Sequence, residues 1–304
     1  GMNSILKLAG RNIKIYLRDR AAVFFSLLSM LIVIVLMLVF LGDMNVESIT
    51  KLLAEYGVGS AEDNGKHAQL LVLLWTIGGV LCVNGVTVTT MTLSIMINDA
   101  ASGRLNSFRT APISRASLAM GYIFSSWAAS VFICLITLAA GELFAAANGA
   151  QLPGIAGQLG LIGVIALNSF TYAGVMYFAA TLVRTQGAWS GFSTLTGTLV
   201  GFLGGIYLPI GSLPEAVQTA LKCLPTIYGC SVFRSILTEN ALAQTFEGAP
   251  AQLVSEYGEA MGITLKFGET EIVMGLQLAI LAGYGIIFAA AAALISKRRA
   301  QSDR

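Results

Sequence analysis

The sequence predicts an all-α integral membrane protein with six transmembrane helices. An N-terminal amphipathic interfacial helix precedes them, and an external re-entrant helical hairpin precedes the last span. Three observations carry this prediction. The 304 residues are 56% hydrophobic and only 11% charged, whereas soluble domains carry about 25% charged residues. Uncharged stretches long enough to cross about 30 Å of hydrocarbon as helices recur along the chain. Lys and Arg are concentrated in alternate connecting segments.

Residues 3–18 are expected to form an amphipathic helix. At 100° per residue, one narrow face holds four basic side chains: Lys7, Arg11, Lys14 and Arg18. The opposite face is mainly apolar: Ile5, Ala9, Ile13, Tyr16 and Leu17. A helix with these two faces is suited to lie in the membrane interface. Alternatively, the charges simply flank the first span on its positive side, and the two interpretations are compatible.

Six stretches are predicted to span the membrane, within one transmembrane domain that covers residues 1–304. They lie at about 21–41, 68–97, 116–141, 155–183, 188–207 and 271–295. The stretch 68–97 is longer than a span needs, so it either tilts or extends beyond the bilayer. Ser114 is a suitable N-cap for the third span, and Pro112 prevents the preceding helix from running straight into it.

Residues 208–238 depart from this pattern. Prolines and charged residues interrupt an otherwise apolar sequence: Pro209, Pro214, Glu215, Lys222, Pro225 and Arg234. Two short helices that dip into the outer leaflet, at about 213–223 and 226–238, fit this composition better than a span does. Residues 239–270 are polar and acidic, so we expect an external segment there.

Charge placement predicts the orientation. We assign the N-terminus, the loop 98–115, Arg184 and the C-terminal tail to the inner side. That side then carries 13 Lys and Arg residues, and the outer side carries 5. The positive-inside rule therefore predicts a multi-pass protein of the cell (inner) membrane with both termini in the cytoplasm. The net charge of +2 conceals this split, so it gives no reason to expect a nucleic-acid partner.

The residues that chemistry would need are missing from the predicted spans. No Asp, Glu, Lys, Arg or His lies deep within a span, although ion-coupled carriers and intramembrane proteases usually need such groups. His67 has no partner at metal-ligand spacing, so no metal site is expected. The chain also lacks a G-x-x-x-x-G-K-[ST] phosphate loop. We therefore expect no enzyme activity and no cofactor in this chain, and any ATP and Mg²⁺ would bind another polypeptide.

The four cysteines give little functional signal. Cys82 and Cys134 fall in apolar stretches, where cysteine usually acts as a small buried hydrophobe. Cys223 and Cys230 lie on either side of Pro225, and a disulfide between them would need a broken helix. We favour unpaired thiols, although the sequence alone leaves the redox state of Cys223 and Cys230 open.

Two strings stand at particular topological places. The first, in the inner loop and the following span, is Gly103-Arg104-Leu105, then Ala111-Pro112-Ile113-Ser114-Arg115 and Gly121-Tyr122. The second, before the last span, is Leu208-Pro209-Ile210, Leu213-Pro214, Leu224-Pro225 and Arg234. With these strings and the order of its parts, the chain resembles the transmembrane (permease) subunit of type-2 ATP-binding-cassette (ABC) transporters. This is a bacterial export class that includes drug, polysaccharide and peptide exporters.

The resemblance implies that the loop 98–115 contains a coupling helix that contacts a separate ABC ATPase subunit. The implied contact residues are Asp99, Gly103, Arg104, Phe108 and Arg109. In the family an acidic residue with a basic neighbour often stands early in this loop. Here Ala100 and Ala101 follow Asp99, so we place the contact mainly on Arg104, Phe108 and Arg109. The alternative is a solvated basic loop that merely obeys the positive-inside rule.

The resemblance also implies a second permease copy, in a homodimer or a related heterodimer. The two copies would form a path for an unknown exported substrate, as in multidrug or antibiotic export, with an amphipathic or lipid-like compound weakly favoured. The expected lining comes from the second and fifth spans: Asn84, Thr87, Met91, Thr194 and Thr198. Gly197-x-x-x-Gly201 suits close helix packing. An ATP-independent carrier and a six-span scaffold or sensor are the alternative functions.

Overall fold

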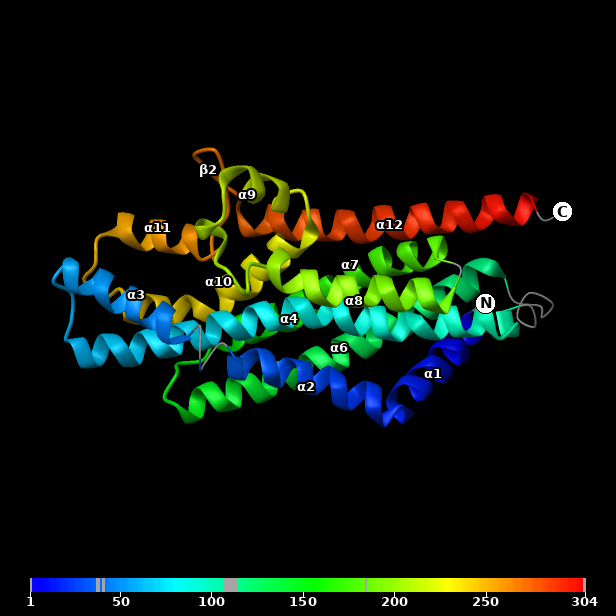
Figure 1. Cartoon of the computed structure of the whole chain (residues 1–304), viewed down its shortest axis with the longest axis horizontal. Helices are drawn as coiled ribbons and strands as arrows, with labels where there is room; N and C mark the ends of the chain where they lie inside the picture. Colours follow the sequence, from blue (N-terminus) through cyan, green and yellow to red (C-terminus); the bar gives the residue numbers. More distant parts are fainter. Residues whose placement is uncertain (1, 37–38, 40–41, 106–113, 184, 303–304) are drawn as a thin grey trace.

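The structure is a computed structural model that describes residues 2–36, 39, 42–105, 114–183 and 185–302. The long helices lie side by side and run roughly along the longest dimension of the molecule (Figure 1). Both termini and residues 98–105 lie at one end, which we call the loop end. Helices α3 (Gly42–Glu55) and α11 (Ala251–Ala260) lie at the other end, which we call the cap end. Both ends of the chain therefore share a side with the segment that begins the predicted inner loop.

Helix α4 (Ala61–Ala101) is the central element. Its 41 residues correspond to about 60 Å of helix. Ser60 caps it by accepting a hydrogen bond from the Asp63 amide, and Glu62 and Asp63 complement the helix dipole. Its apolar stretch is almost completely buried, because it packs against helices on every side. The predicted second span is thus extended at both ends, and α4 includes the first residues of the predicted loop.

Three other helices resemble α4 in length and apolar character: α6 (Arg115–Ala147), α7 (Ile155–Leu182) and α12 (Met274–Ser302). Helices α7 and α12 approach closely, since a Cβ on Gly174 would lie 2.6 Å from the Gly285 carbonyl oxygen. Within the described residues, these three and α4 are the four helices long and apolar enough to cross a membrane. They confirm helices at the predicted second, third, fourth and sixth spans.

The other two predicted spans have shorter helices. Helix α2 (Arg20–Leu36) has 17 residues, and the predicted span 21–41 continues partly outside the described residues. Helix α8 (Gln186–Leu203) has 18 residues, many of them Gly, Ser or Thr. It ends before the predicted residue 207 because the chain turns at Gly205, where φ is +63°. The count of six spans therefore stays a prediction.

The predicted hairpin is realised differently. A 3₁₀ turn, η2 (Ile210–Ser212), precedes α9 (Glu215–Leu221) and α10 (Pro225–Thr245). The prediction of a second short helix at 226–238 was wrong in length, because α10 continues to Thr245. Helix α10 packs against α4, α7 and α12, and most side chains in its first half are buried. Its position relative to the outer leaflet stays a prediction.

The segment 239–270 contains the end of α10, then α11 and a short antiparallel hairpin of β1 (Lys266–Phe267) and β2 (Thr270–Glu271). Lys266 Nζ lies 2.9 Å from Glu259 Oε2, and this ion pair raises the pKa of Lys266. Glu142, one residue beyond the predicted third span, lies inside α6, where it accepts a hydrogen bond of 2.6 Å from Gln158.

The four cysteines have free thiols in the structure. Cys223 is exposed and Cys230 is buried, so the two do not pair. Cys82 and Cys134 are buried, as their apolar surroundings in the sequence predicted.

Candidate functional site

Helix α1 (Met2–Arg18) packs lengthwise on α6 at the loop end. Leu8 sits over Gly121, where an added Cβ would lie 2.4 Å from Leu8 Cδ2, so only glycine allows this approach. Asn12 is fully buried, and its Nδ2 donates to Ser125 Oγ over 3.3 Å. The predicted faces were therefore rotated: Asn12 lies on the buried face, whereas Leu17 is 45% exposed.

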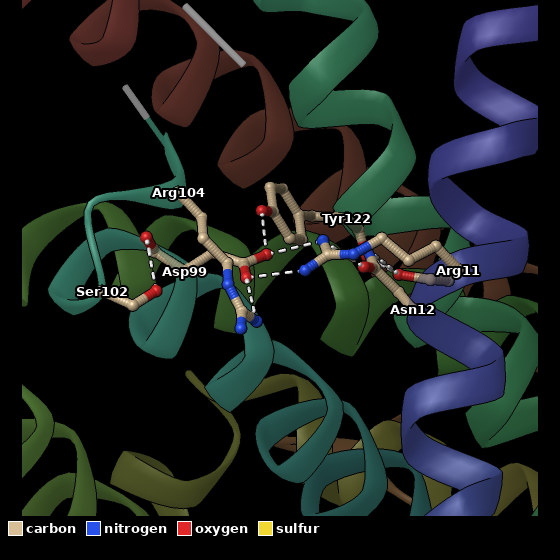
Figure 2. A network of polar contacts seen from close by, with 7 residues as sticks. Arg11, Asn12, Asp99, Ser102, Arg104 and Tyr122 are labelled. Atoms are coloured by element: carbon tan, nitrogen blue, oxygen red, sulfur yellow. Dashed lines mark hydrogen bonds and ion pairs between the residues drawn. The ribbon is translucent and has the colours of Figure 1, made fainter. Parts of the chain in front are cut away.

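A two-point ion pair joins α1 to the end of α4 (Figure 2). Arg11 donates from Nη1 to Asp99 Oδ2 and from Nη2 to Asp99 Oδ1, each over 2.7 Å. The planar guanidinium matches a carboxylate in this geometry, which lysine does not reproduce. The sequence put a salt-bridge role for Asp99 in doubt, because Ala100 and Ala101 follow it where the family often has a basic neighbour. The partner comes instead from a residue 88 positions earlier.

Three further groups complete this cluster, which we call the Asp99 network and define as Arg11, Asn12, Asp99, Arg104 and Tyr122. The Tyr122 hydroxyl, from α6, donates to Asp99 Oδ2 over 2.7 Å. Arg104 lies at the edge, with its Nη1 4.0 Å from Asp99 Oδ1 and its side chain 68% exposed. Asn12 Oδ1 accepts from Arg11 over 3.3 Å. Three helices thus converge on one carboxylate.

Asp99 is only 2% exposed, so its charge depends on Arg11 for compensation. The Arg11 side chain is 28% exposed and keeps some contact with solvent. The hydrogen bonds and the charge of Asp99 raise the pKa of Arg11, despite partial burial, so Arg11 stays cationic. Removing one member of such a pair leaves a buried charge uncompensated, at about 3–5 kcal/mol for a fully buried case. The network therefore holds α1, α4 and α6 in one arrangement.

This arrangement fixes both sides of the predicted coupling loop. Asp99 lies in the last turn of α4, at the start of the loop 98–115, and Tyr122 follows the loop in the second turn of α6. Helix α8 joins at the same level, because Gln186 Nε2 donates to Asn98 Oδ1 over 2.6 Å. A displacement of the loop would therefore be transmitted to α1, α4, α6 and α8 together.

The predicted site residues separate into distinct positions. Lys7, Lys14 and Arg18 are exposed on α1. Arg11 lines the same groove as these three, but its guanidinium turns to Asp99. Asp99 itself points inward, away from any docking surface in this conformation. Gly103 turns the chain after α4 with φ at +74°, and Arg104 is exposed beside it. Phe108 and Arg109 lie outside the described residues, so their contact role stays a prediction.

The predicted pathway residues do not form one surface within a single chain. Asn84 is 2% exposed, and its Nδ2 donates to Thr137 of α6 over 2.9 Å. Met91 faces α2, where Ser26 Oγ donates to its sulfur over 3.2 Å. Thr87 is half-buried. Thr194 and Thr198 lie on the exposed side of α8.

Sequence reasoning missed three residues that matter for this arrangement. Tyr122 was noted only as part of the Gly-Tyr string that follows the loop. Asn12 was passed over, although a polar residue on the buried side of an amphipathic helix often marks a partner contact. Arg234 was counted among the external charges, but it is 1% exposed and lies against Trp75 of α4. Its signal was a single arginine inside the apolar run from Val232 to Leu237.

Comparison with protein-family models gives a match that covers this site. The model described as "ABC-2 type transporter" matches residues 3–238, which run from α1 into α10 and include the whole Asp99 network. Comparison with curated protein sequences gives no match. The family is defined by the membrane domain of these transporters, not by an ATPase domain. The match covers well over half of the chain, and the chain therefore belongs to the ABC-2 type transporter family as a multi-pass permease.

Proposed function

We propose that this chain is the permease subunit of an ATP-driven exporter and is coupled to separate ATPase subunits that bind ATP and Mg²⁺. The observation that carries the proposal is the Asp99 network. It joins α1 to both helices that flank the segment 98–115. A loop that only satisfied the positive-inside rule would not need a buried ion pair at its base.

In the mechanism that we propose, the ATPase subunit contacts the loop end through Arg104, Phe108 and Arg109. ATP-driven closure of the ATPase subunits displaces the loop. The ion pair between Arg11 and Asp99 makes α1 follow that displacement, and the Tyr122 hydroxyl makes α6 follow it. Because the bonds are charge-assisted and short, the three helices move as one body.

The membrane orientation is part of the proposal. Both chain termini lie at the loop end (Figure 1), and the basic residues Lys7, Lys14 and Arg18 are exposed there. The cap end carries the acidic segment around α11. The loop end would therefore face the cytoplasm, and α1 would lie in the inner interface of the cell membrane.

A second copy completes the proposed pathway. Helix α8 buries only Trp189, Val200 and Gly201 within the chain. Thr194 and Thr198 lie on its exposed side, and a Cβ on Gly197 would meet no atom within 4 Å. Small side chains allow close helix contacts in membranes, so α8 is suited to face a homodimeric or related partner across the path. The resemblance to the export class supports export as the direction of transport. The absence of a charged residue on α8 favours an amphipathic substrate.

The test is co-purification with a candidate ABC ATPase subunit, followed by ATP hydrolysis in nanodiscs. Wild type should bind that subunit and raise its hydrolysis rate. Arg104→Glu should weaken binding, whereas the matched control Lys51→Glu, exposed at the cap end, should not. A chain that binds no ATPase subunit would favour the carrier or scaffold, and a loop insensitive to Arg104→Glu would be the ordinary basic loop.

A further inference from the structure

Arg234 poses a physical problem that the proposed function does not address. It is 1% exposed, and no carboxylate pairs with it in the part of the chain that the structure describes. A buried cation without an opposite charge is costly unless other groups compensate. The neighbours of Arg234 therefore indicate what its charge holds in place.

Two backbone carbonyls and one aromatic ring surround the guanidinium. Nη2 donates to the Gly205 carbonyl over 3.3 Å, and Nη1 donates to the Met261 carbonyl over 3.4 Å. The guanidinium carbon lies 4.0 Å from the centroid of the Trp75 ring, which is a cation–π distance. The Trp75 indole also donates to the Met261 carbonyl over 2.8 Å. Arg234 and Trp75 therefore hold the same carbonyl from two sides.

Both carbonyls belong to the C-terminal ends of helices. Gly205 follows the cap residue of α8, and Met261 is the cap residue of α11. The last carbonyls of a helix carry partial negative charge and attract a cation. Two helix ends thus take the place of a carboxylate, and the cation joins α8 and α11 to each other.

The same side chain also fixes α10 to α4. A Cβ on Gly79 would lie 3.1 Å from Arg234 Nη2, and a Cβ on Gly78 would lie 3.1 Å from the Arg234 backbone nitrogen. The two glycines therefore allow α10 and the guanidinium to lie directly on α4. Trp75, Gly78 and Gly79 belong to one turn of α4, so the end of α8, the end of α11 and the middle of α10 meet on this turn.

We propose that Arg234 is the positioning residue of a joint at the cap end, which passes the displacement of α4 to α8 and α11. Trp75 and Asp99 are 24 positions apart on one continuous helix, about 36 Å along its axis. This separation is close to the thickness of the hydrocarbon core. Helix α4 would move as a rigid unit, so a displacement at Asp99 would shift the helix ends that Arg234 holds. The inference rests on the proposed function and assigns a path for its force.

The joint is tested first in the chain alone, by hydrogen exchange in nanodiscs. Arg234→Met should accelerate exchange about tenfold or more at the amides of Ile206 and Ile263, which close the turns after α8 and α11. Exchange in α1 should stay unchanged. The control Lys51→Met removes an exposed cation of α3 and should change neither amide. Unchanged exchange at both amides in Arg234→Met would overturn the joint.

A milder variant keeps this test decisive if Arg234→Met does not fold. Trp75→Phe retains an aromatic face but loses the indole donor to the Met261 carbonyl. It should accelerate exchange at Ile263 more than at Ile206, because only the α11 carbonyl loses a donor. If Trp75→Phe exchanged both amides at the wild-type rates, the role assigned to Trp75 and Arg234 would be contradicted.

The second test uses the complex with the ATPase subunit and compares exchange in α8 with and without ATP and vanadate. Arg234→Met should keep ATP hydrolysis but lose the nucleotide-dependent change in α8, which a purely stabilising residue would not uncouple. If wild type shows neither stimulated hydrolysis nor this change, the proposed function fails. The exchange experiment on the chain alone then still decides whether Arg234 holds α8 and α11 together.

A crosslink distinguishes a joint that stays closed from a gate that opens. A Cβ at position 204 would lie 2.9 Å from Cys230 Sγ, so Gly204→Cys should form a disulfide between α8 and α10 when oxidised. The other native cysteines are replaced by alanine in this experiment. The closed joint predicts that the crosslinked complex keeps the nucleotide-dependent change in α8. Its loss on oxidation and recovery on reduction would overturn the proposal.

Discussion

Two charged side chains are buried against α4, Asp99 in its last turn and Arg234 on the turn from Trp75 to Gly79, and they are compensated in different ways. Asp99 at the loop end meets a full opposite charge on Arg11 and a hydroxyl donor on Tyr122. Arg234 at the cap end meets only helix-end carbonyls and the Trp75 ring. The Asp99 network keeps a partly exposed edge through Arg11, whereas Arg234 is enclosed.

This difference suggests different mechanical roles. A charge pair with a solvent edge can hydrate each member if it separates, so breaking the Asp99 network should cost less than breaking the Arg234 site. Separation of Arg234 from its carbonyls would leave a cation and the Gly205 carbonyl unpaired in an apolar site. The cap end should therefore be the more rigid of the two, and the following variants test that order.

The largest effect is expected for Arg234→Ala. The variant removes the donor to the Gly205 carbonyl and one of the two donors to the Met261 carbonyl, and it opens a cavity against Trp75. It should lower the free energy of unfolding by about 3–5 kcal/mol. Unfolding in mixed SDS micelles measures this loss. Arg234→Met fills most of the volume and should lose less. A loss below that of Asp99→Asn would reverse the proposed order of rigidity.

The next effect is expected for Asp99→Asn, which removes the charge but keeps the shape. Arg11 retains some solvent, so the loss should be about 2–3 kcal/mol. A double-mutant cycle with Arg11→Met should give a coupling of about 1–3 kcal/mol. Additive effects of the two substitutions, measured by the same unfolding method, would show that the ion pair does not hold α1 to α4.

A smaller effect is expected for Tyr122→Phe, which removes one hydrogen bond to the carboxylate. The loss should be about 1–2 kcal/mol. The variant separates α6 from the network without disturbing Arg11, so it should reduce coupling to the ATPase less than Asp99→Asn does. These effects are compared by the ATP hydrolysis rates of the ATPase complexes of wild type, Asp99→Asn and Tyr122→Phe. A larger defect in Tyr122→Phe would show that the loop acts mainly through α6.

The smallest effect on stability is expected for Arg104→Ala. Its side chain is 68% exposed and lies 4.0 Å from Asp99, so the loss should be below about 0.5 kcal/mol. Its effect should appear instead in binding of the ATPase subunit. A marked loss of stability with normal binding would show that Arg104 stabilises the Asp99 network and does not contact the ATPase subunit.

The sequence predicted most helices because their signals are local. Uncharged length placed α4, α6, α7 and α12, and Ser114 caps α6 as its position before the third span indicated. The ion pair between Arg11 and Asp99 was not predictable in this way. Its members are 88 residues apart. The apolar pattern of residues 3–18 did not define the buried face closely enough to show that Arg11 contacts a buried carboxylate.

Arg234 shows a second reason for failure. Composition indicated a proline-rich external stretch, because charge is normally excluded from the apolar interior. The burial of Arg234 depends on two helix ends and a tryptophan from three other segments. Such a site exists only after α8, α11 and α4 have been brought together, so no local pattern contains it.

The most direct test of the central claim is the nucleotide-dependent change in hydrogen exchange of α8 in Asp99→Asn, measured in the complex with the ATPase subunit. If the Asp99 network ties α1 and α6 to α4 so that the loop displaces the three helices together, the variant should bind the ATPase subunit and hydrolyse ATP, yet show little change in α8. A change in α8 as large as in wild type would contradict the account.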